Sequence, residues 1–494
     1  MKTSEPVEIS SLNRLHPVSI LYFAVKTLKE LYAFLPLIPL IVIFSNELFG
    51  RPVNRLWLSV FLVTVAVLLI AILGWLRWWR FGYFAEKQVF YIEHGLLVKQ
   101  KIWIHSNRIQ SLDTIQSIYD RWFGLLRLNV ETAGGKKPEA VLSSITSTEA
   151  ARIRKELGFS TESTTDHRSI HDQAKESEAG VRILSVSGLL IHSLLPDKFM
   201  YVFVIFSVGA FKFGHEWLKA SSIWGYLQDQ LGSAWIVLLI LILFTLSWII
   251  AVTINLLGDY GFKLESDGDK LVIERGLLER KHITLPLDRI QAIHLVEHTL
   301  HKPLGYVSIR AVTAGIMGKD EKTITLFPVV RRGEEIDFLK RFVPAFSVPQ
   351  EWSGVEPKTK RNFIVFPTLL LLITTIPAMI WLPWHLGWIV MFLSFIVFAY
   401  GSMEYKQMGW SIVDGYIAIR YGGFSRHRVI IPKRRVQWHQ MSQTPFQEYR
   451  QLANLRIALA SGKGAAKFTL RYASLQHVRQ LVDSITNCRT SNMR

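Results

Sequence analysis

The chain has 494 residues, of which 50% are hydrophobic and only 19% are charged, and its mean hydropathy is +0.23. Soluble proteins carry about 25% charged residues, so this composition favours a membrane protein over a purely soluble one. The net charge of +18 calls for an anionic partner surface, either lipid or nucleic acid. The single cysteine, Cys488, excludes a disulfide framework and a cysteine-ligated metal site.

The first 30 residues predict a polar tail followed by an interfacial helix. Leu15, Val18, Tyr22 and Val25 recur at helical spacing, with basic residues beside them. An amphipathic helix with a basic polar face is typical of a segment that lies in the membrane surface.

Six apolar runs are arranged as three pairs: 31–46 with 56–79, 199–213 with 234–257, and 363–386 with 388–403. The second run of each of the first two pairs is long enough to cross a hydrocarbon core of about 30 Å as a helix of about 20 residues. The weaker runs each precede a strong one, so we predict three hairpins and six transmembrane helices. If the weaker runs are instead interfacial or re-entrant, successive soluble segments would lie on opposite faces of the membrane.

Charge separates the two sides of the predicted hairpins. The short connections 45–55, 214–233 and 384–387 have no net charge, because they hold Arg51, Arg55 and Lys219 against Glu47, Glu216 and Asp229. The whole positive charge therefore lies on the other side. Lysine and arginine in short loops mark the cytoplasmic side, so both termini and all large segments are predicted to be cytoplasmic, at the cell inner membrane.

A soluble pattern follows each hairpin, three times in all. Each copy has a glycine and, thirteen residues later, an arginine that opens an Arg-(Ile/Val)-Gln triplet. The pairs are Gly95 with Arg108, Gly276 with Arg289, and Gly422 with Arg435. Fourteen residues after the glutamine come Gly124 and Gly305, where the third copy has Gln451. Three matches at held spacing identify an internal repeat.

Each repeat has the features of β-structure. Asp-Gly pairs at 267–268 and 414–415 lie between short alternating runs, which indicates two-residue hairpin turns. In the first copy Leu126, Leu128 and Val130 alternate with polar residues, which predicts one buried face and one solvent-exposed face. With a helix at its end, each repeat is expected to be an α+β unit of six or seven strands and one helix.

The order of these features resembles the bacterial pleckstrin-homology-like, membrane-flanked domain family. The features are a strand run, Gly-Leu-Leu, a basic strand, Arg-Ile-Gln, then Phe-Gly-Leu and Val-x-Thr-Ala-Gly-Gly before a terminal helix. The arrangement is similar to polytopic members of that family with three such domains, over nearly the whole chain after residue 15. The third copy departs at Gln451 and has Leu459-Ala460-Ser461 for Thr-Ala-Gly, which puts a shared surface in doubt there. The resemblance implies PH-like β-sandwich or barrel domains, membrane location and no established enzymatic activity.

No set of residues indicates catalysis or metal binding. His215-Glu216 lacks the second histidine of the zinc-protease motif, and 462–464 is too short for a phosphate-binding loop. The fifteen histidines show no ligand spacing. We therefore expect no enzymatic activity, no cofactor and no metal.

Transport is the alternative function. The chain would then be a component of a small-molecule or lipid transporter or exporter, with the hairpins forming the path. Transporters usually carry ionisable residues at mid-membrane, but 56–76, 234–257, 363–386 and 388–402 contain no Asp, Glu, Lys or Arg. This pattern disfavours proton-coupled transport.

The candidate contact residues are basic side chains of the three repeats. Near an anionic leaflet each such residue contributes roughly 1 kcal/mol, so they are predicted to contact acidic head groups or an acidic partner. The alternative is a solvated face that only follows the positive-inside bias, with the triplet arginines paired inside the fold. The residues are Lys99, Lys101 and Arg108 in the first copy, Arg280, Lys281 and Arg289 in the second, and Arg426, Arg428, Arg434 and Arg435 in the third.

We expect a non-enzymatic polytopic inner-membrane protein whose cytoplasmic PH-like domains are binding or assembly modules, in envelope homeostasis or stress protection. Its expected partners are the lipid bilayer with anionic phospholipid head groups, and a second copy or a related membrane protein, but no nucleic acid. The expected segments are the tail and interfacial helix (1–30), hairpins at 31–79, 184–257 (with a lead-in) and 363–403, PH-like domains at 80–158, 258–346 and 404–488, linkers at 159–183 and 347–362, and a tail at 489–494.

Overall fold

The structure is a computed structural model, and it describes residues 12–31, 54–86, 89–96, 98–132, 140–158, 180–196, 199–209, 234–314, 323–381, 384–413, 415–461 and 464–491. The chain divides into two compact units: Met1–Asp172 with Glu279–Ile283, and Gln173–Leu278 with Thr284–Arg494. Several predicted features lie outside the described residues, namely the run 32–46, the connections 45–53 and 214–233, most of the linker at 159–179, the turn residue Asp414, the segments 133–139 and 462–463, and the last three residues of the tail.

The first unit contains the first repeat and the helices before it. Its helices are α1 (Ser19–Leu31), α4 (Arg55–Trp79), α5 (Ile118–Trp122) and α6 (Ser147–Glu156). An antiparallel sheet joins β1 (Gly82–Glu86), β2 (Val89–His94) and β3 (Gln100–His105), with β3 at its edge. After a 3-10 turn, η2 (Ser106–Arg108), strands β4 (Ile109–Gln116), β5 (Leu125–Thr132) and β6 (Ala140–Thr146) pair in this order.

Helix α1 packs on the first domain. Leu15 and Phe23 belong to the hydrophobic core that the strands and α6 build. The Ser19 hydroxyl donates to the Ser143 carbonyl at 2.7 Å, and the Trp78 indole N–H donates to the Leu15 carbonyl at 2.9 Å. One face of the predicted interfacial helix therefore faces the domain, and its position in the membrane surface stays a prediction.

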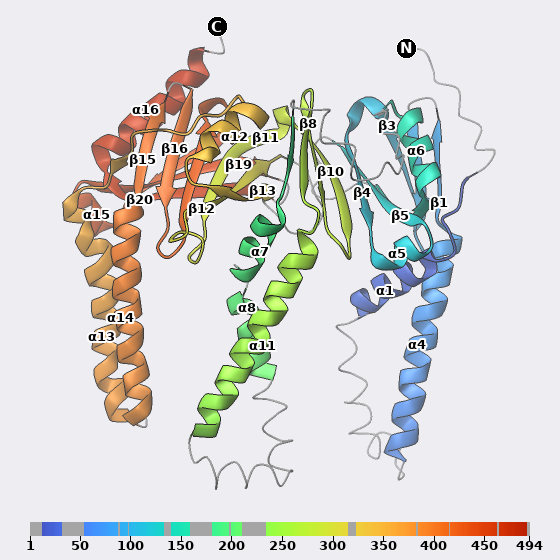
Figure 1. Cartoon of the computed structure of the whole chain (residues 1–494), viewed down its shortest axis with the longest axis horizontal. Coiled ribbons are helices and arrows are strands. Elements are labelled where there is room, and N and C mark those ends of the chain that lie inside the picture. Colours follow the sequence, from blue (N-terminus) through green and yellow to red (C-terminus); the bar gives the residue numbers. More distant parts are fainter. Residues whose placement is uncertain are drawn as a thin grey trace. The chain divides into compact units, whose positions relative to one another are not determined.

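The second unit contains the third repeat and the second repeat without Glu279–Ile283 (Figure 1). Before the second repeat come β7 (Val181–Ile183), α7 (Val186–Leu194), α8 (Phe199–Gly209) and α11 (Ala234–Gly258). The repeat itself has β8 (Lys263–Asp267), β9 (Lys270–Arg275), β10 (Arg280–Pro286), η4 (Leu287–Arg289), β11 (Ile290–Glu297), β12 (Tyr306–Thr313), β13 (Thr323–Arg331) and α12 (Glu334–Phe342). Strand β7 pairs with β8, so the end of the segment predicted as a linker extends a sheet.

The third repeat follows its own helical hairpin. The preceding elements are β14 (Ser353–Gly354), η5 (Pro357–Thr359), α13 (Lys360–Trp381) and α14 (Trp384–Gln407). The domain has β15 (Gly409–Val413), β16 (Tyr416–Tyr421), β17 (Arg426–Pro432), η6 (Lys433–Arg435), β18 (Val436–Ser442), α15 (Pro445–Tyr449), β19 (Leu452–Ser461), β20 (Gly464–Ser474) and α16 (Leu475–Ser491). Each repeat is thus six strands and a C-terminal helix, as the sequence predicted.

The conserved spacing of the repeats has a structural origin in two turns. At the aligned glycine the backbone φ is +125° for both Gly95 and Gly422. A Cβ on either residue would lie about 2 Å from a carbonyl oxygen, that of Val98 or Ser425, so only glycine fits the turn that leads into the third strand. Thirteen residues later the triplet arginine ends the 3-10 turn, and the next residue begins the fourth strand buried in the core.

The third copy keeps the backbone turn found at Gly124, although it has no glycine at the corresponding position. Gly124 and Gly305 have φ of +64° and +71°, and Gln451 has φ of +54°. In the first and third copies a short helix precedes this residue, and a capping box opens it, from Ser117 in α5 and from Thr444 in α15. The third copy therefore differs in residue type but has the same left-handed turn.

The predicted alternation of strand 126–131 is wrong in detail. Leu125 is buried while Leu126 is half-buried, because the register shifts at a bulge between Leu126 and Leu128. The polar face is not open to solvent either. Glu131 is 3% exposed, and its carboxylate lies 3.4 Å from the hydroxyl of Ser111 on the neighbouring strand.

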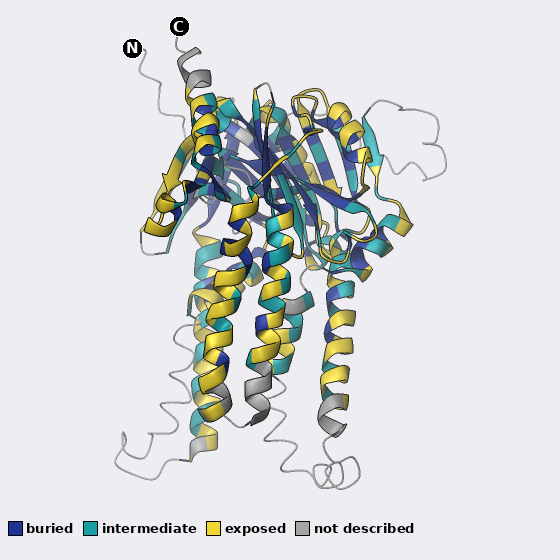
Figure 2. Ribbon diagram, turned by 90° about the vertical axis from the view of Figure 1, so that its left-hand side faces the viewer, coloured by how far each residue is buried: buried dark blue, intermediate teal, exposed yellow. Residues whose placement is uncertain are grey.

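Three helices of the described residues are long and apolar enough to cross a membrane: Leu56–Trp79, Leu238–Gly258 and Pro357–Pro377. Figure 2 shows these helices largely exposed, whereas the strands are mostly buried. Helix α14 packs along α13, as predicted for the third hairpin. Of the two weaker runs, 32–46 lies outside the described residues, and the described part of 199–213 is the 11-residue helix α8 (Phe199–Gly209). The arrangement of six spans therefore remains a prediction.

The second and third repeats share one continuous sheet. Its strand order is β13-β12-β11-β17-β16-β15-β14, in which β11 of the second repeat pairs antiparallel with β17 of the third. The register runs from Ile293 opposite Ile430 to Glu297 opposite Arg426. Every residue of β11 is buried, because it lies in the middle of this sheet and both of its faces are covered.

Candidate functional site

The joint between β11 and β17, which we call the seam, ends at a buried carboxylate. The Glu297 side chain is 1% exposed. Arg332 donates a hydrogen bond to its Oε2. The guanidinium nitrogens of Arg426 and Arg428 lie 3.6 Å and 3.3 Å from its carboxylate oxygens. A buried charge is tolerated only when it is paired, so Glu297 requires cations from both repeats.

A second carboxylate extends this network to helix α12. Nη2 of Arg428 lies 3.1 Å from Oε1 of Glu335, whose side chain is 4% exposed. The other oxygen of Glu335 accepts the backbone N–H of Gly333 at the start of α12. Arg428 of the third repeat thus contacts two acidic residues of the second, which fixes the register of the two domains.

Two histidines lie beside the network, one on each strand of the seam. Nε2 of His294 lies 3.1 Å from Nδ1 of His427, and the Tyr421 ring stacks on His427 at 5.0 Å. Burial lowers the pKa of His294 well below its ordinary value, and the charges of His427 and Arg310 add to this effect. Burial and then Arg310 lower the pKa of His427 to about 4. Both rings are therefore neutral at neutral pH, and one donates its N–H to the other.

The predicted basic residues divide between the seam and the surface. In the third copy Arg426 and Arg428 lie in the seam, and Nη2 of Arg435 donates to the Asp288 carbonyl of the second repeat at 2.6 Å. Arg434 is exposed. Three of the four residues thus contact the neighbouring domain.

In the first copy the basic residues lie on or beside the edge strand β3. Lys101 and Arg108 are exposed, and Lys99 pairs with Glu93. Although burial disfavours its charge, hydrogen bonds from Lys99 and Tyr91 hold the pKa of Glu93 below its ordinary value. Lys99 and Lys101 stand four and six residues after Gly95, as Arg426 and Arg428 stand after Gly422.

In the second copy the three predicted residues remain near the surface. Arg280 is exposed, and Lys281 and Arg289 are half-buried. Nε of Arg289 lies 3.8 Å from the carboxylate of Asp288 beside it in the chain, a weak pairing. The structure brings none of the three into the seam.

Sequence reasoning missed the acidic and histidine members of the seam, Glu297 and His294. Both fall on a strand that reads as an ordinary buried strand, IQAIHLVE, and no motif marks them. Within the described part of the chain, no group of three or more His, Cys, Asp or Glu could hold a metal ion. The site therefore pairs buried carboxylates with arginines and joins strand β11 to strand β17.

Two strands that correspond to the seam partners lie at sheet edges. The counterpart of β11 in the third repeat is β18, at the edge of the sheet β18-β19-β20. Its Trp438 and Met441 are 38% and 44% exposed. The counterpart of β17 in the first repeat is β3, whose Trp103 is 57% exposed. Exposed edge strands with apolar side chains are sites of strand addition.

Comparison with known proteins gives a consistent result. The model of the bacterial PH domain family matches the chain three times, at residues 34–159, 203–341 and 368–488. The chain is also similar to the UPF0699 transmembrane protein YdbT of Bacillus subtilis (strain 168), with 27% identity over 485 residues, 94% of this chain and 96% of that protein. No solved structure matches the chain significantly.

Proposed function

Because the chain belongs to the bacterial PH domain family, we propose that it is a non-enzymatic inner-membrane protein whose PH-like domains are assembly modules. The observation that carries this function is the seam, in which two domains of the family join through β11 and β17 into one sheet. Joining by edge strands gives affinity through main-chain hydrogen bonds and specificity through side chains. The seam has both kinds of interaction. Strands β11 and β17 pair through their backbones, and the Glu297 carboxylate pairs with Arg426 and Arg428 of β17.

The seam also supports a prediction of the partner. In it, the fourth strand of one repeat pairs with the third strand of the next. The fourth strand of the last repeat, β18, and the third strand of the first repeat, β3, lie at sheet edges. The partner is therefore another PH-like domain with a complementary edge, either in a second copy of this chain or in a related membrane protein. In a related protein with an acidic residue at the position of Glu297, Lys99 and Lys101 would then pair with it as Arg426 and Arg428 do, whereas β18 of this chain is followed there by Gln443.

Charging the exposed edge tests this function. We expect full-length protein, purified from membranes in mild detergent, to form an oligomer or to retain a PH-domain partner. Trp438→Lys with Met441→Lys should release it as a monomer, because lysines on an edge strand prevent strand addition. Light scattering with mass spectrometry measures the change.

The matched control is Ile336→Lys, which charges an exposed apolar residue on α12 and should leave the assembly intact. A wild-type protein that is monomeric and without partner contradicts the proposal. Solute flux into liposomes that contain this protein alone would support the transport alternative instead.

The orientation of the domains is part of the same proposal. We propose that both termini and all three PH-like domains lie in the cytoplasm, because the short connections of the predicted hairpins carry no net charge and the positive charge lies on the other side. Reporter fusions at Ser163, Gln350 and the C-terminus should all read cytoplasmic. An external signal at any of the three positions contradicts the three-hairpin topology.

A further inference from the structure

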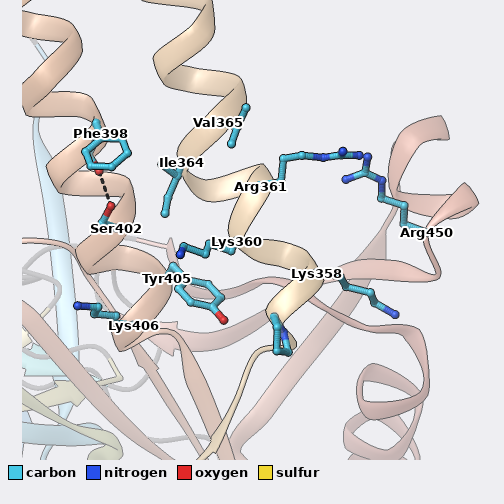
Figure 3. A pocket seen from close by; sticks show the side chains of 11 residues that line it. Lys358, Lys360, Arg361, Ile364, Val365, Phe398, Ser402, Tyr405, Lys406 and Arg450 are labelled. Carbon is cyan, nitrogen blue, oxygen red and sulfur yellow. Dashed lines mark hydrogen bonds between the residues drawn. The ribbon is translucent and has the colours of Figure 1, made fainter.

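A pocket of about 910 Å3 lies where the third hairpin meets the third domain. The first turns of α13 and the last turns of α14 form its walls, and Arg450, which follows α15, closes one side. Figure 3 shows the side chains that line it. None of the pocket residues takes part in the seam, so this site is separate from the proposed assembly function.

The polar rim of the pocket is cationic. Its charged lining residues are Lys358, Lys360, Arg361, Lys406 and Arg450, and no Asp or Glu lines it. Lys358 is paired with Glu356 at 2.7 Å, and Arg450 donates to the Asn362 amide oxygen at 3.1 Å. Among the described residues, the others have no carboxylate within 4 Å.

Two guanidinium groups converge at this rim. Arg361 of α13 and Arg450 point toward one another in Figure 3. The two positive charges repel each other, and an anion bound between them would offset this repulsion. Arginine side chains can bind a phosphate group with two parallel hydrogen bonds. The partial positive charge at the start of the long helix α13 acts in the same direction. The rim therefore fits one phosphate.

The wall above the rim is apolar. Val365 and Phe398 are 45% and 47% exposed, and both line the pocket on the helices of the hairpin. The Ser402 hydroxyl on this wall donates to the Phe398 carbonyl at 2.8 Å. Because this wall continues into the apolar surface of α13 and α14, a ligand that fills the pocket has a charged end and a hydrocarbon end.

Aromatic side chains next to Arg450 place the rim at the membrane surface. Phe446 and Tyr449 of α15 are 80% and 91% exposed, although their helix is held by a capping box. In the first repeat α5 presents Tyr119 and Trp122 in the same way, 61% and 74% exposed. Exposed aromatic residues near the ends of transmembrane helices are typical of the lipid head-group region.

We infer that this pocket binds one anionic phospholipid of the cytoplasmic leaflet. Arg361 and Arg450 hold its phosphate, Lys360 and Lys406 add to the positive field, and an acyl chain lies along Val365 and Phe398. The combination of a phosphate site with an apolar wall distinguishes a lipid from free phosphate, which would gain nothing from the wall.

Native mass spectrometry of the full-length protein tests the site. Protein in mixed micelles with phosphatidylglycerol and phosphatidylcholine should retain phosphatidylglycerol in preference. Arg361→Gln with Arg450→Gln should lower the bound phosphatidylglycerol by about tenfold or more, the weakening that follows loss of one charge-assisted hydrogen bond. Arg361→Gln alone, at an exposed side chain, should also weaken binding, which guards against misfolding of the double variant.

The matched control removes two exposed cations outside the pocket, with Lys155→Gln on α6 and Lys340→Gln on α12, and should keep binding within about twofold. Equal retention of the two lipids, or an equal loss in the control, overturns the site. Displacement of phosphatidylglycerol by millimolar inorganic phosphate would identify free phosphate as the ligand and also overturn it. Because this readout is bound lipid and not oligomeric state, its failure leaves the assembly function untouched.

Discussion

Replacing Glu297 by glutamine is expected to open the seam, with a loss of about 3 kcal/mol in the free energy that holds β11 against β17. The substitution keeps the shape of the side chain but removes a charge that pairs with Arg332, Arg426 and Arg428 together. Arg428, which is 12% exposed, loses one of its two carboxylate partners, and removing one partner of a buried ion pair is among the largest single-residue effects. Hydrogen exchange of the β11 and β17 amides in full-length protein should speed up about a hundredfold.

Glu265→Gln provides the control in the same unit. Glu265 pairs with Lys263 at 2.7 Å, but both side chains are more than a third exposed. A surface pair of this kind contributes about 1 kcal/mol or less, so exchange at the seam should stay unchanged. Similar exchange in Glu297→Gln and in the wild type would show that the network does not hold the domains together.

Acid is expected to weaken the same seam between pH 7 and pH 4. His294 and His427 have pKa values lowered by burial, to about 4 for His427, whereas the ordinary value is about 6.5. In this window the opened state binds protons and the closed state does not. Stability therefore falls as pH falls, by at most about 1.4 kcal/mol per pH unit for each histidine.

The charged groups beside His294 and His427 disfavour protonation of the two rings. Burial first, and then the charges of His427, Arg310 and His298, lower the pKa of His294, and burial and Arg310 lower that of His427. Exchange at β11 and β17, corrected for the intrinsic effect of pH, should show the loss, and His427→Phe should reduce the slope. If the β11 and β17 amides of the wild type are equally protected from hydrogen exchange at pH 7 and pH 5, this account is wrong.

The repeat, the family and the six-strand unit were predictable because they depend on local turns. Gly95 and Gly422 cannot be replaced in their tight turn, and the triplet arginine ends a short helix at a fixed distance from them. These constraints fix the number of residues between the glycine and the triplet arginine, and a fixed spacing can be recognised from the sequence alone. Gln451 shows the limit, since the same left-handed backbone is kept by a different residue.

The seam could not be predicted from the sequence, because it is a contact between repeats. Nothing in the pattern of β11 distinguishes a strand with a free edge from one paired to a neighbouring domain. Arg426 and Arg428 were identified as basic residues that contact an acidic group, but Glu297 lies more than a hundred residues away. The pocket at the third hairpin was missed for the same reason, since Arg361 and Arg450 meet only after folding.

The continuous sheet has a mechanical consequence. Helix α11 leads directly into the second domain, and α14 leads directly into the third. Since the two domains are joined along β11 and β17, tilting one of these helices against the other would strain a ladder of backbone hydrogen bonds. The sheet is therefore a stiff connection between α11 and α14, and we expect a tilt of one of these helices to be transmitted to the other.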